Sequence, residues 1–165
     1  MRNTMLKFRR STVLLGVLLG VLLGVLLAAL LSTQAFAAPM LVTLYKNLQC
    51  TCCEAYAKFL EEQGFKVEVK PVRDLHSIDQ KAGVPEALEG CHTSFIGGYV
   101  VIGHVPIDAI RKLLAERPKI VGISIPGMSS MPANLPGMPG PRSQPVAIYE
   151  ITADGSPSKI FMTVR

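Results

Sequence analysis

Three of the four cysteines in this chain lie within four consecutive positions, where a strand-like apolar run gives way to a helical pattern. The run is Cys50-Thr51-Cys52-Cys53, and the fourth cysteine, Cys91, is followed directly by His92. Thiols at a helix N-terminus face unpaired backbone N–H groups and the positive end of the helix dipole, and both favour the thiolate. Because thiolates attack disulfides and bind soft metals, this turn predicts redox chemistry or metal binding.

The hydrophobic pattern predicts a mixed α/β domain over residues 38–120. Buried or alternating apolar runs indicate strands, and apolar residues at helical spacing indicate helices. In chain order we expect a strand at 41–45, a helix at 52–63, a strand at 65–69, a short helix at 74–82, a hairpin at 93–102 and a helix that begins at 106 and is closed by Pro118. This β-α-β-α-β-β-α order is typical of thioredoxin-like domains, which have a mixed sheet with helices on both faces.

The composition changes after this domain. Residues 121–145 are rich in Met, Pro and Gly and have no hydrophobic period, so they are predicted to form a loop. Strand patterns then return on both sides of Asp154-Gly155 and predict a C-terminal hairpin over 146–165, packed on the same domain. Because strands resume after the loop, we expect the loop to be held against the domain at both ends.

Residues 1–37 have the composition of a secretory signal peptide. Basic residues precede an uncharged apolar run from Val13 to Leu31, and Ala35-Phe36-Ala37 supplies the small residues that a signal peptidase reads. We therefore expect export to the bacterial periplasm, a compartment that permits disulfides. The apolar run is long enough that an uncleaved anchor is the alternative, and only then would the protein contact a membrane.

Charge and motifs exclude several function classes. The net charge of +5 comes mostly from the leader, which holds four of the 17 basic residues and none of the 12 acidic ones. The rest of the chain is nearly neutral and has no basic–aromatic stripe, which argues against nucleic-acid binding. The sequence also has no paired-carboxylate site, serine–histidine pattern or phosphate loop. We therefore favour a metal-binding or redox protein over a turnover enzyme.

One interpretation of the cysteine turn is a redox dithiol. Cys50 and Cys53 have C-x-x-C spacing, with Cys50 as the nucleophile and Cys53 as the resolving thiol. The presence of Cys52 argues against this interpretation, because a third thiol could attack the disulfide and form a different one by exchange. Pro85 also lies too far before Cys91 to be the cis-proline of thioredoxin-like enzymes. A purely structural disulfide is disfavoured, since Cys-x-Cys-Cys spacing is expected to strain an internal bridge.

The other interpretation is a soft-metal site. In a thioredoxin-like fold the strand after Cys91 begins beside the first helix, so Cys91 would face Cys50, Cys52 and Cys53. Four converging thiolates favour Cu(I), and the adjacent Cys52 and Cys53 suit a multinuclear cluster. Zinc is the disfavoured alternative, because it prefers a closed tetrahedral cage with ligands spaced in pairs.

Histidine and methionine supply further candidate ligands. His92 is equally compatible with a metal ligand and with a hydrogen-bonded residue beside the ligands. For His104 a satisfied, hydrogen-bonded histidine is the favoured interpretation. Met128 and Met138 each follow Pro-Gly, where core residues are rare, and thioether is a Cu(I) ligand.

The motifs of the mature chain also occur together in a known family. They are Leu-Tyr-Lys before Cys-x-Cys-Cys, Gly-Phe-Lys-Val, Gly-Val-Pro, Cys-His-Thr, Gly-Gly-Tyr-Val-x-x-Gly-His-Val-Pro and two Pro-Gly-Met units. On these motifs the chain resembles the CopG family of periplasmic copper-resistance proteins over nearly all of the mature chain. The resemblance implies a thioredoxin-like fold, copper that cycles between Cu(I) and Cu(II), and thiol ligands at Cys50, Cys52, Cys53 and Cys91. His92, His104, Met128 and Met138 match recurrent positions of the family.

Together these observations predict a periplasmic protein that binds Cu(I), with several ions per chain, for sequestration or for exchange of oxidation state in copper tolerance. The expected partner is a copper efflux or copper-handling protein, and a membrane-anchored metallochaperone is a further alternative. In an oxidising compartment an empty site would tend to form a disulfide, so copper loading would need a reductant.

Overall fold

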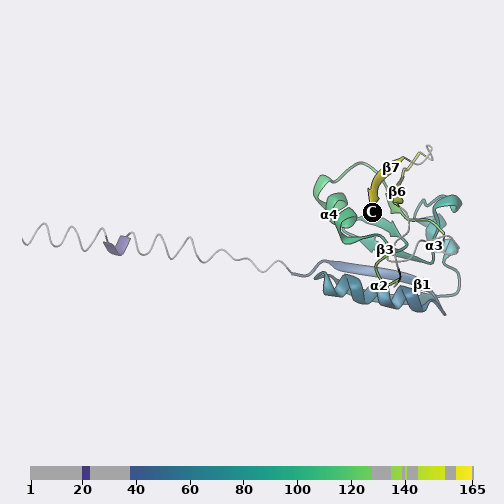
Figure 1. The fold of residues 1–165 in the computed structure, drawn as a ribbon, viewed down its shortest axis with the longest axis horizontal. Coiled ribbons are helices and arrows are strands. Elements are labelled where there is room, and N and C mark those ends of the chain that lie inside the picture. Colours follow the sequence, from purple (N-terminus) through teal and green to yellow (C-terminus); the bar gives the residue numbers. More distant parts are fainter. Residues whose placement is uncertain are drawn as a thin grey trace, which may run out of the picture. The chain divides into compact units, whose positions relative to one another are not determined.

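The computed structural model describes residues 20–22, 38–127, 135–138, 140, 145–154 and 159–164. The chain divides into two units, residues 1–38 and 39–165, and the sheet belongs entirely to the second (Figure 1). In the first unit, residues 20–22 form a helical turn. Met128 and nearly all of the predicted leader lie outside the described residues. Within the described part of the chain, none of the helices has the length and apolar character needed to cross a membrane.

Seven strands form one mixed sheet in the order β2-β1-β3-β4-β5-β6-β7. They are β1 (Leu41–Asn47), β2 (Lys66–Val72), β3 (His92–Ile96), β4 (Tyr99–Ile102), β5 (Gly122–Ser124), β6 (Val146–Ile151) and β7 (Ile160–Val164). The pairs β1–β2 and β4–β5 are parallel, and the other neighbouring pairs are antiparallel. The predicted mixed α/β class is therefore confirmed.

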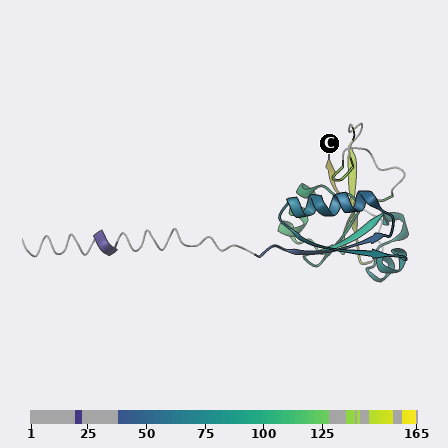
Figure 2. The same ribbon diagram turned by 90° about the horizontal axis from the view of Figure 1, so that it is seen from below.

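Helices cover both faces of this sheet. They are α2 (Thr51–Glu62), α3 (His76–Lys81), the short 3₁₀ helix η1 (Glu86–Leu88) and α4 (Ile107–Glu116). Val101 of β4 packs in the main apolar core with residues of α2 and α4, whereas its neighbours Val100 and Ile102 pack with Val84 and Leu88 beside η1. Successive strand residues face opposite sides, so α2 and α4 share one face, and Figure 2 shows α2 lying along it.

Local sequence explains where these elements begin and end. Gly97 and Gly98 have φ of 57° and 91°, values that favour glycine, and they form the predicted turn between β3 and β4. The Asp74 carboxylate accepts a hydrogen bond of 3.0 Å from the backbone N–H of Ser77 at the start of α3. Arg117 adopts the left-handed conformation directly after α4 and before Pro118, which ends the helix near the predicted position.

The structure differs from the sequence prediction after residue 121. The predicted loop begins with β5, which pairs in parallel with β4 and antiparallel with β6. A strand of three residues is too short to show a hydrophobic period, so the sequence pattern could not indicate it. β6 and β7 pair antiparallel and extend the same sheet. β5 thus joins the C-terminal strands to the strands that carry the cysteine turn.

Candidate metal centre

The cysteine turn connects β1 to α2. Cys50 N donates a hydrogen bond of 3.1 Å to the Asn47 carbonyl, and Cys50 itself is the N-cap residue of α2. Cys52 and Cys53 follow in the first helical turn. Cys50 and Cys53 are buried, with 7% and 0% of their surface exposed, whereas Cys52 is partly exposed. The sulfurs therefore lie where the helix dipole favours negative charge, and Cys52 is the one most accessible to solvent.

The fourth cysteine reaches this turn through strand pairing. Cys91 directly precedes β3, and β3 runs antiparallel to β1 with His92 opposite Lys46. This register places the start of β3 beside the end of β1. The sulfur atoms of Cys50, Cys52, Cys53 and Cys91 consequently all lie within 4.8 Å of one another. The two distant segments of the chain meet as the sequence analysis expected, in a cluster that can hold a metal ion.

Two of these sulfurs are covalently joined. Cys50 and Cys53 form a disulfide with a Cα–Cα separation of 5.4 Å, and Cys52 and Cys91 are free. The expectation that Cys-x-Cys-Cys spacing disfavours an internal bridge is therefore wrong, because one helical turn brings the two Cα atoms to an ordinary disulfide distance. Cys52 Sγ lies 3.5 Å from Cys50 Sγ. The structure thus shows an oxidised cluster with a thiol in contact with the disulfide.

Two histidines extend the cluster on the side of Cys91. The Cys91 sulfur lies 3.3 Å from His92 Nδ1 and 3.6 Å from His104 Nε2, and all three side chains are buried. These three residues form a second group whose ligand atoms lie within 4.8 Å of one another. Cys91 belongs to both groups, so its sulfur is the point where a sulfur-rich set and a nitrogen-containing set meet.

Hydrogen bonding fixes the orientation of the His104 ring. His104 Nδ1 donates to the Pro136 carbonyl at 2.6 Å, and this tautomer leaves Nε2 with a lone pair directed at Cys91. The sequence favours a hydrogen-bonded role for His104, and Nδ1 has this role. The other ring nitrogen, Nε2, faces the cluster. The second nitrogen of His92, Nε2, is buried without a hydrogen-bond partner among the described residues.

Burial sets the protonation of the Cys91 thiol and of the two imidazoles. It raises the pKa of the Cys91 thiol to about 12, and the neighbouring Cys52 thiol adds to this rise. Burial likewise lowers the pKa of His92 to about 3, with a further contribution from His104, whose own pKa is also lowered by burial. Both imidazoles are therefore neutral at neutral pH, which is the form that binds metals, and metal binding to Cys91 would release its proton.

The Pro/Gly/Met-rich segment contacts the cluster through residues 135–138. Besides the bond from His104 to Pro136, Gly137 lies so close to α2 that an added Cβ would be 2.8 Å from Tyr56 N and 3.2 Å from the Cys52 carbonyl. Met138 is partly buried and packs against the main apolar core. Its role as a ligand stays a prediction, as does that of Met128, which lies outside the described residues.

Sequence reasoning missed two residues that contact the cluster. Tyr56 is fully buried, donates its hydroxyl to the Val105 carbonyl at 2.8 Å, and packs its ring 4.6 Å from His92 and 5.2 Å from His104 between ring centroids. Lys46 is buried at the end of β1 and donates to the Cys50 carbonyl at 3.2 Å. The signal for Lys46 was present in the sequence, since it continues the alternation of the core residues Val42 and Leu44.

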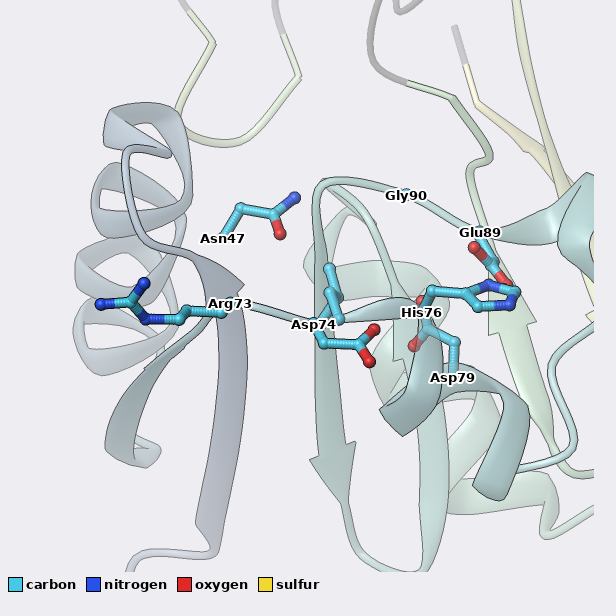
Figure 3. A pocket seen from close by; sticks show the side chains of 8 residues that line it. Asn47, Arg73, Asp74, His76, Asp79, Glu89 and Gly90 are labelled. Atoms are coloured by element: carbon cyan, nitrogen blue, oxygen red, sulfur yellow. The ribbon is translucent and has the colours of Figure 1, made fainter.

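A polar pocket of about 270 Å³ opens beside α3 (Figure 3). It is lined by Asn47, Arg73, Asp74, Leu75, His76, Asp79, Glu89 and Gly90. The exposed His76 pairs with Glu89 at 2.8 Å, and this hydrogen bond raises the pKa of His76. The pocket adjoins the cluster through Gly90, which precedes Cys91, but no cysteine lines it.

The fold and the cluster together define a mixed α/β protein with four clustered cysteines that could hold a metal ion. The family described as "Protein of unknown function, DUF411" matches residues 88–138, which include Cys91, His92 and His104. A search of curated proteins finds no match.

Two solved structures are similar over most of the chain. "Copper resistance protein copG- Form 2" is 34% identical with a TM-score of 0.69, over 77% of this chain and 99% of that chain. "Copper resistance protein copG- Form 1" is 34% identical with a TM-score of 0.68, over 76% of this chain and 98% of that chain. The chain therefore belongs to the CopG family, and the predicted resemblance is confirmed.

Proposed function

We propose that this protein binds copper as Cu(I) on the thiolates of Cys50, Cys52, Cys53 and Cys91. The observation that carries the proposal is the convergence of these four sulfurs from two distant segments within 4.8 Å. Sulfur ligands at adjacent positions favour Cu(I) over harder ions. The names of the two similar solved structures, both copper resistance proteins, support copper over zinc.

The overlap of the two ligand groups favours more than one ion per chain. A thiolate can bridge two metal ions, and Cys91 belongs both to the sulfur group and to the group with His92 and His104. One ion would be held mainly by sulfur, and a second would use Cys91 together with an imidazole nitrogen. The neutral histidines described above suit this role, because each has one unprotonated ring nitrogen whose lone pair can bind a metal ion. A single zinc ion would leave the histidine group unused.

The disulfide links copper loading to electron transfer. Converting the Cys50–Cys53 disulfide to two thiolates takes up two electrons, and only then are all four sulfurs free to bind copper. A thiol reductant can supply both electrons and becomes oxidised to its own disulfide. Alternatively, two Cu(I) ions can each give up one electron and become Cu(II). This second route would convert Cu(I) to Cu(II) within the site. The protein would then change the oxidation state of copper in addition to sequestering it.

We further propose that this chemistry takes place in the bacterial periplasm, with a copper efflux or copper-handling protein as the partner. The support is the basic, apolar and small-residue pattern of residues 1–37. The mass of the protein purified from a periplasmic fraction tests this part. A chain that begins at Ala38 supports export with cleavage, whereas a full-length chain in the membrane fraction supports the anchored alternative.

Anaerobic titration of the reduced protein with Cu(I) tests copper binding. We expect more than one copper per chain, a lower affinity in Cys91→Ser and loss of the second ion in His104→Asn. His76→Asn is the matched control, because His76 is exposed and pairs with Glu89 away from the cluster. Binding that is unchanged in Cys91→Ser, or equally weakened by His76→Asn, would contradict the proposal.

The second candidate is a thiol–disulfide oxidoreductase that uses Cys50 and Cys53. It is favoured by the disulfide itself, which joins two cysteines three residues apart at the start of α2. Insulin reduction distinguishes the two functions. Turnover that survives both Cys52→Ser and Cys91→Ser would favour the enzyme, because these changes leave the dithiol intact but remove two of the four copper thiolates.

A further inference from the structure

Lys46 occupies an unusual position for a lysine. The burial pattern of β1 alternates, and Lys46 lies on the same face as Val42 and Leu44, directed into the domain. Only 3% of its side chain is exposed. Lysine is almost never fully buried without a partner, so the partners of its ammonium group indicate what this residue does.

Among the described residues, every contact of this ammonium group lies at the cysteine turn. Nζ donates to the Cys50 carbonyl at 3.2 Å and to the Leu48 carbonyl at 3.4 Å, and it forms an ion pair of 2.9 Å with Glu54 of α2. A residue's sulfur lies within about 5 Å of its own carbonyl oxygen by covalent geometry. The ammonium group therefore lies within about 8 Å of the Cys50 sulfur.

We propose that Lys46 is a positioning residue whose positive charge compensates the reduced cluster. Its hydrogen bonds hold the turn that presents Cys50, and its charge stabilises the thiolates that form when the Cys50–Cys53 disulfide accepts two electrons. The two electrons that open this buried disulfide bring negative charge into the site, and a buried charge needs a nearby opposite charge. Glu54 limits the effect, because it already neutralises part of the lysine charge.

A purely structural role makes a different prediction. If Lys46 and Glu54 served only to hold the turn, removing either partner would break the same ion pair and disturb the cluster in the same direction. If charge is what matters, the two changes act in opposite directions. Loss of the cation disfavours thiolate, whereas loss of the anion leaves the cation less neutralised and favours thiolate.

The test is the redox equilibrium of the copper-free protein with glutathione. Lys46→Gln should shift this equilibrium about tenfold toward the disulfide, equal to a potential about 30 mV more negative. Glu54→Gln should shift it in the opposite direction by a smaller factor, about threefold, because the Glu54 side chain is 63% exposed and its field is screened by water. Lys70→Gln is the matched control, since Lys70 is a half-exposed lysine on β2 that pairs with Glu68.

Opposite shifts in the two variants, with no shift in Lys70→Gln, support the proposal. Shifts in the same direction, no shift, or an equal shift in the control overturn it. Should Lys46→Gln fail to give the native circular dichroism spectrum, Glu54→Gln decides alone. A shift toward the dithiol then supports the proposal, and a shift toward the disulfide or none overturns it.

A second arm rests on the proposed copper-binding function. Lys46→Gln should lower the affinity of the reduced protein for Cu(I) about tenfold, while Lys70→Gln leaves it unchanged. Equal affinities in both variants overturn the role of Lys46 in copper binding. Because the glutathione equilibrium is measured without metal, it still tests the charge of Lys46 if the unmodified protein binds no copper. The two measurements therefore distinguish failure of the copper-binding proposal from failure of the proposed role of Lys46.

Discussion

Asp79 of α3 should make the protein less stable as the pH rises from about 4 to neutral. The residue is 1% exposed, and one carboxylate oxygen accepts a hydrogen bond from the Thr93 hydroxyl on β3. Burial raises the pKa of Asp79 from 3.8 to about 6. The charge of Glu89 adds to this rise, and the hydrogen bond from Thr93 opposes it. The native state therefore binds the Asp79 proton more tightly than the unfolded state does.

The sign and size of the effect follow from this difference. Because the pKa is higher in the folded protein, the stabilisation is fully present below the unfolded-state value of 3.8 and is lost as the pH rises through about 6. Each unit of pKa difference corresponds to about 1.4 kcal/mol, so the free energy of unfolding should fall by at most about 3 kcal/mol from this group.

Replacing Asp79 by Asn isolates this contribution. The amide keeps an oxygen that accepts from Thr93 but never ionises, so Asp79→Asn should match the parent protein near pH 4 and be more stable by up to about 3 kcal/mol near pH 7.5. Urea unfolding of the oxidised, copper-free protein, followed by circular dichroism at both pH values, measures the difference.

Asp74→Asn provides a control with the opposite sign. Hydrogen bonds from Ser77 lower the pKa of the exposed Asp74, so its stabilisation is present above its unfolded-state value and is lost in acid. This variant should be the less stable one at neutral pH and approach the parent protein as the pH falls. A difference between Asp79→Asn and the parent that stays constant from pH 4 to 7.5 would refute the reasoning.

Three further predictions concern the cluster and its surroundings. Tyr56→Phe leaves a buried carbonyl without its donor and should lower the free energy of unfolding by about 1–3 kcal/mol, measured by urea denaturation. Gly137→Ala should weaken Cu(I) binding because its Cβ would meet the backbone of α2 at 2.8 Å. Gly64→Ala, which also has a positive φ but nothing within 4 Å of an added Cβ, should leave Cu(I) binding unchanged. In the unreduced protein, iodoacetamide should label Cys52 faster than the buried Cys91, as followed by mass spectrometry, and equal rates would contradict the burial difference.

The sequence predicted the fold best where the hydrophobic period extends over several residues. The helix around Tyr56 and the hairpin at Gly97-Gly98 have clear local signals, and the structure contains both. β5 has only three residues and depends on its neighbours β4 and β6, so its formation is decided by tertiary pairing. The hydrophobic pattern of the sequence therefore gives little indication of a strand as short as β5.

For the site, the sequence located the sulfurs but not what surrounds them. The spacing of Cys50, Cys52 and Cys53 is local, and Cys91 joined them in the prediction only through an assumed fold. The spacing of the cysteines along the sequence argues against a disulfide. Disulfide formation, however, depends on the distance between the two Cα atoms in the helical turn. The link from His104 to Pro136 joins residues 32 positions apart, and no local pattern could indicate it.

The pairing of β5 with β6 has a consequence for how this protein can evolve. The chain leaves the sheet after Ser124 and re-enters it at Val146 on the adjacent strand. The entropy cost of closing such a connection rises only slowly with its length, by about 0.6 kcal/mol for each doubling. Insertions and deletions in this stretch can therefore accumulate without a change of strand register, provided that Pro136 and Gly137 keep their contacts with His104 and α2. Selection can then vary the side chains that this stretch carries while the turn at Cys50 keeps its geometry.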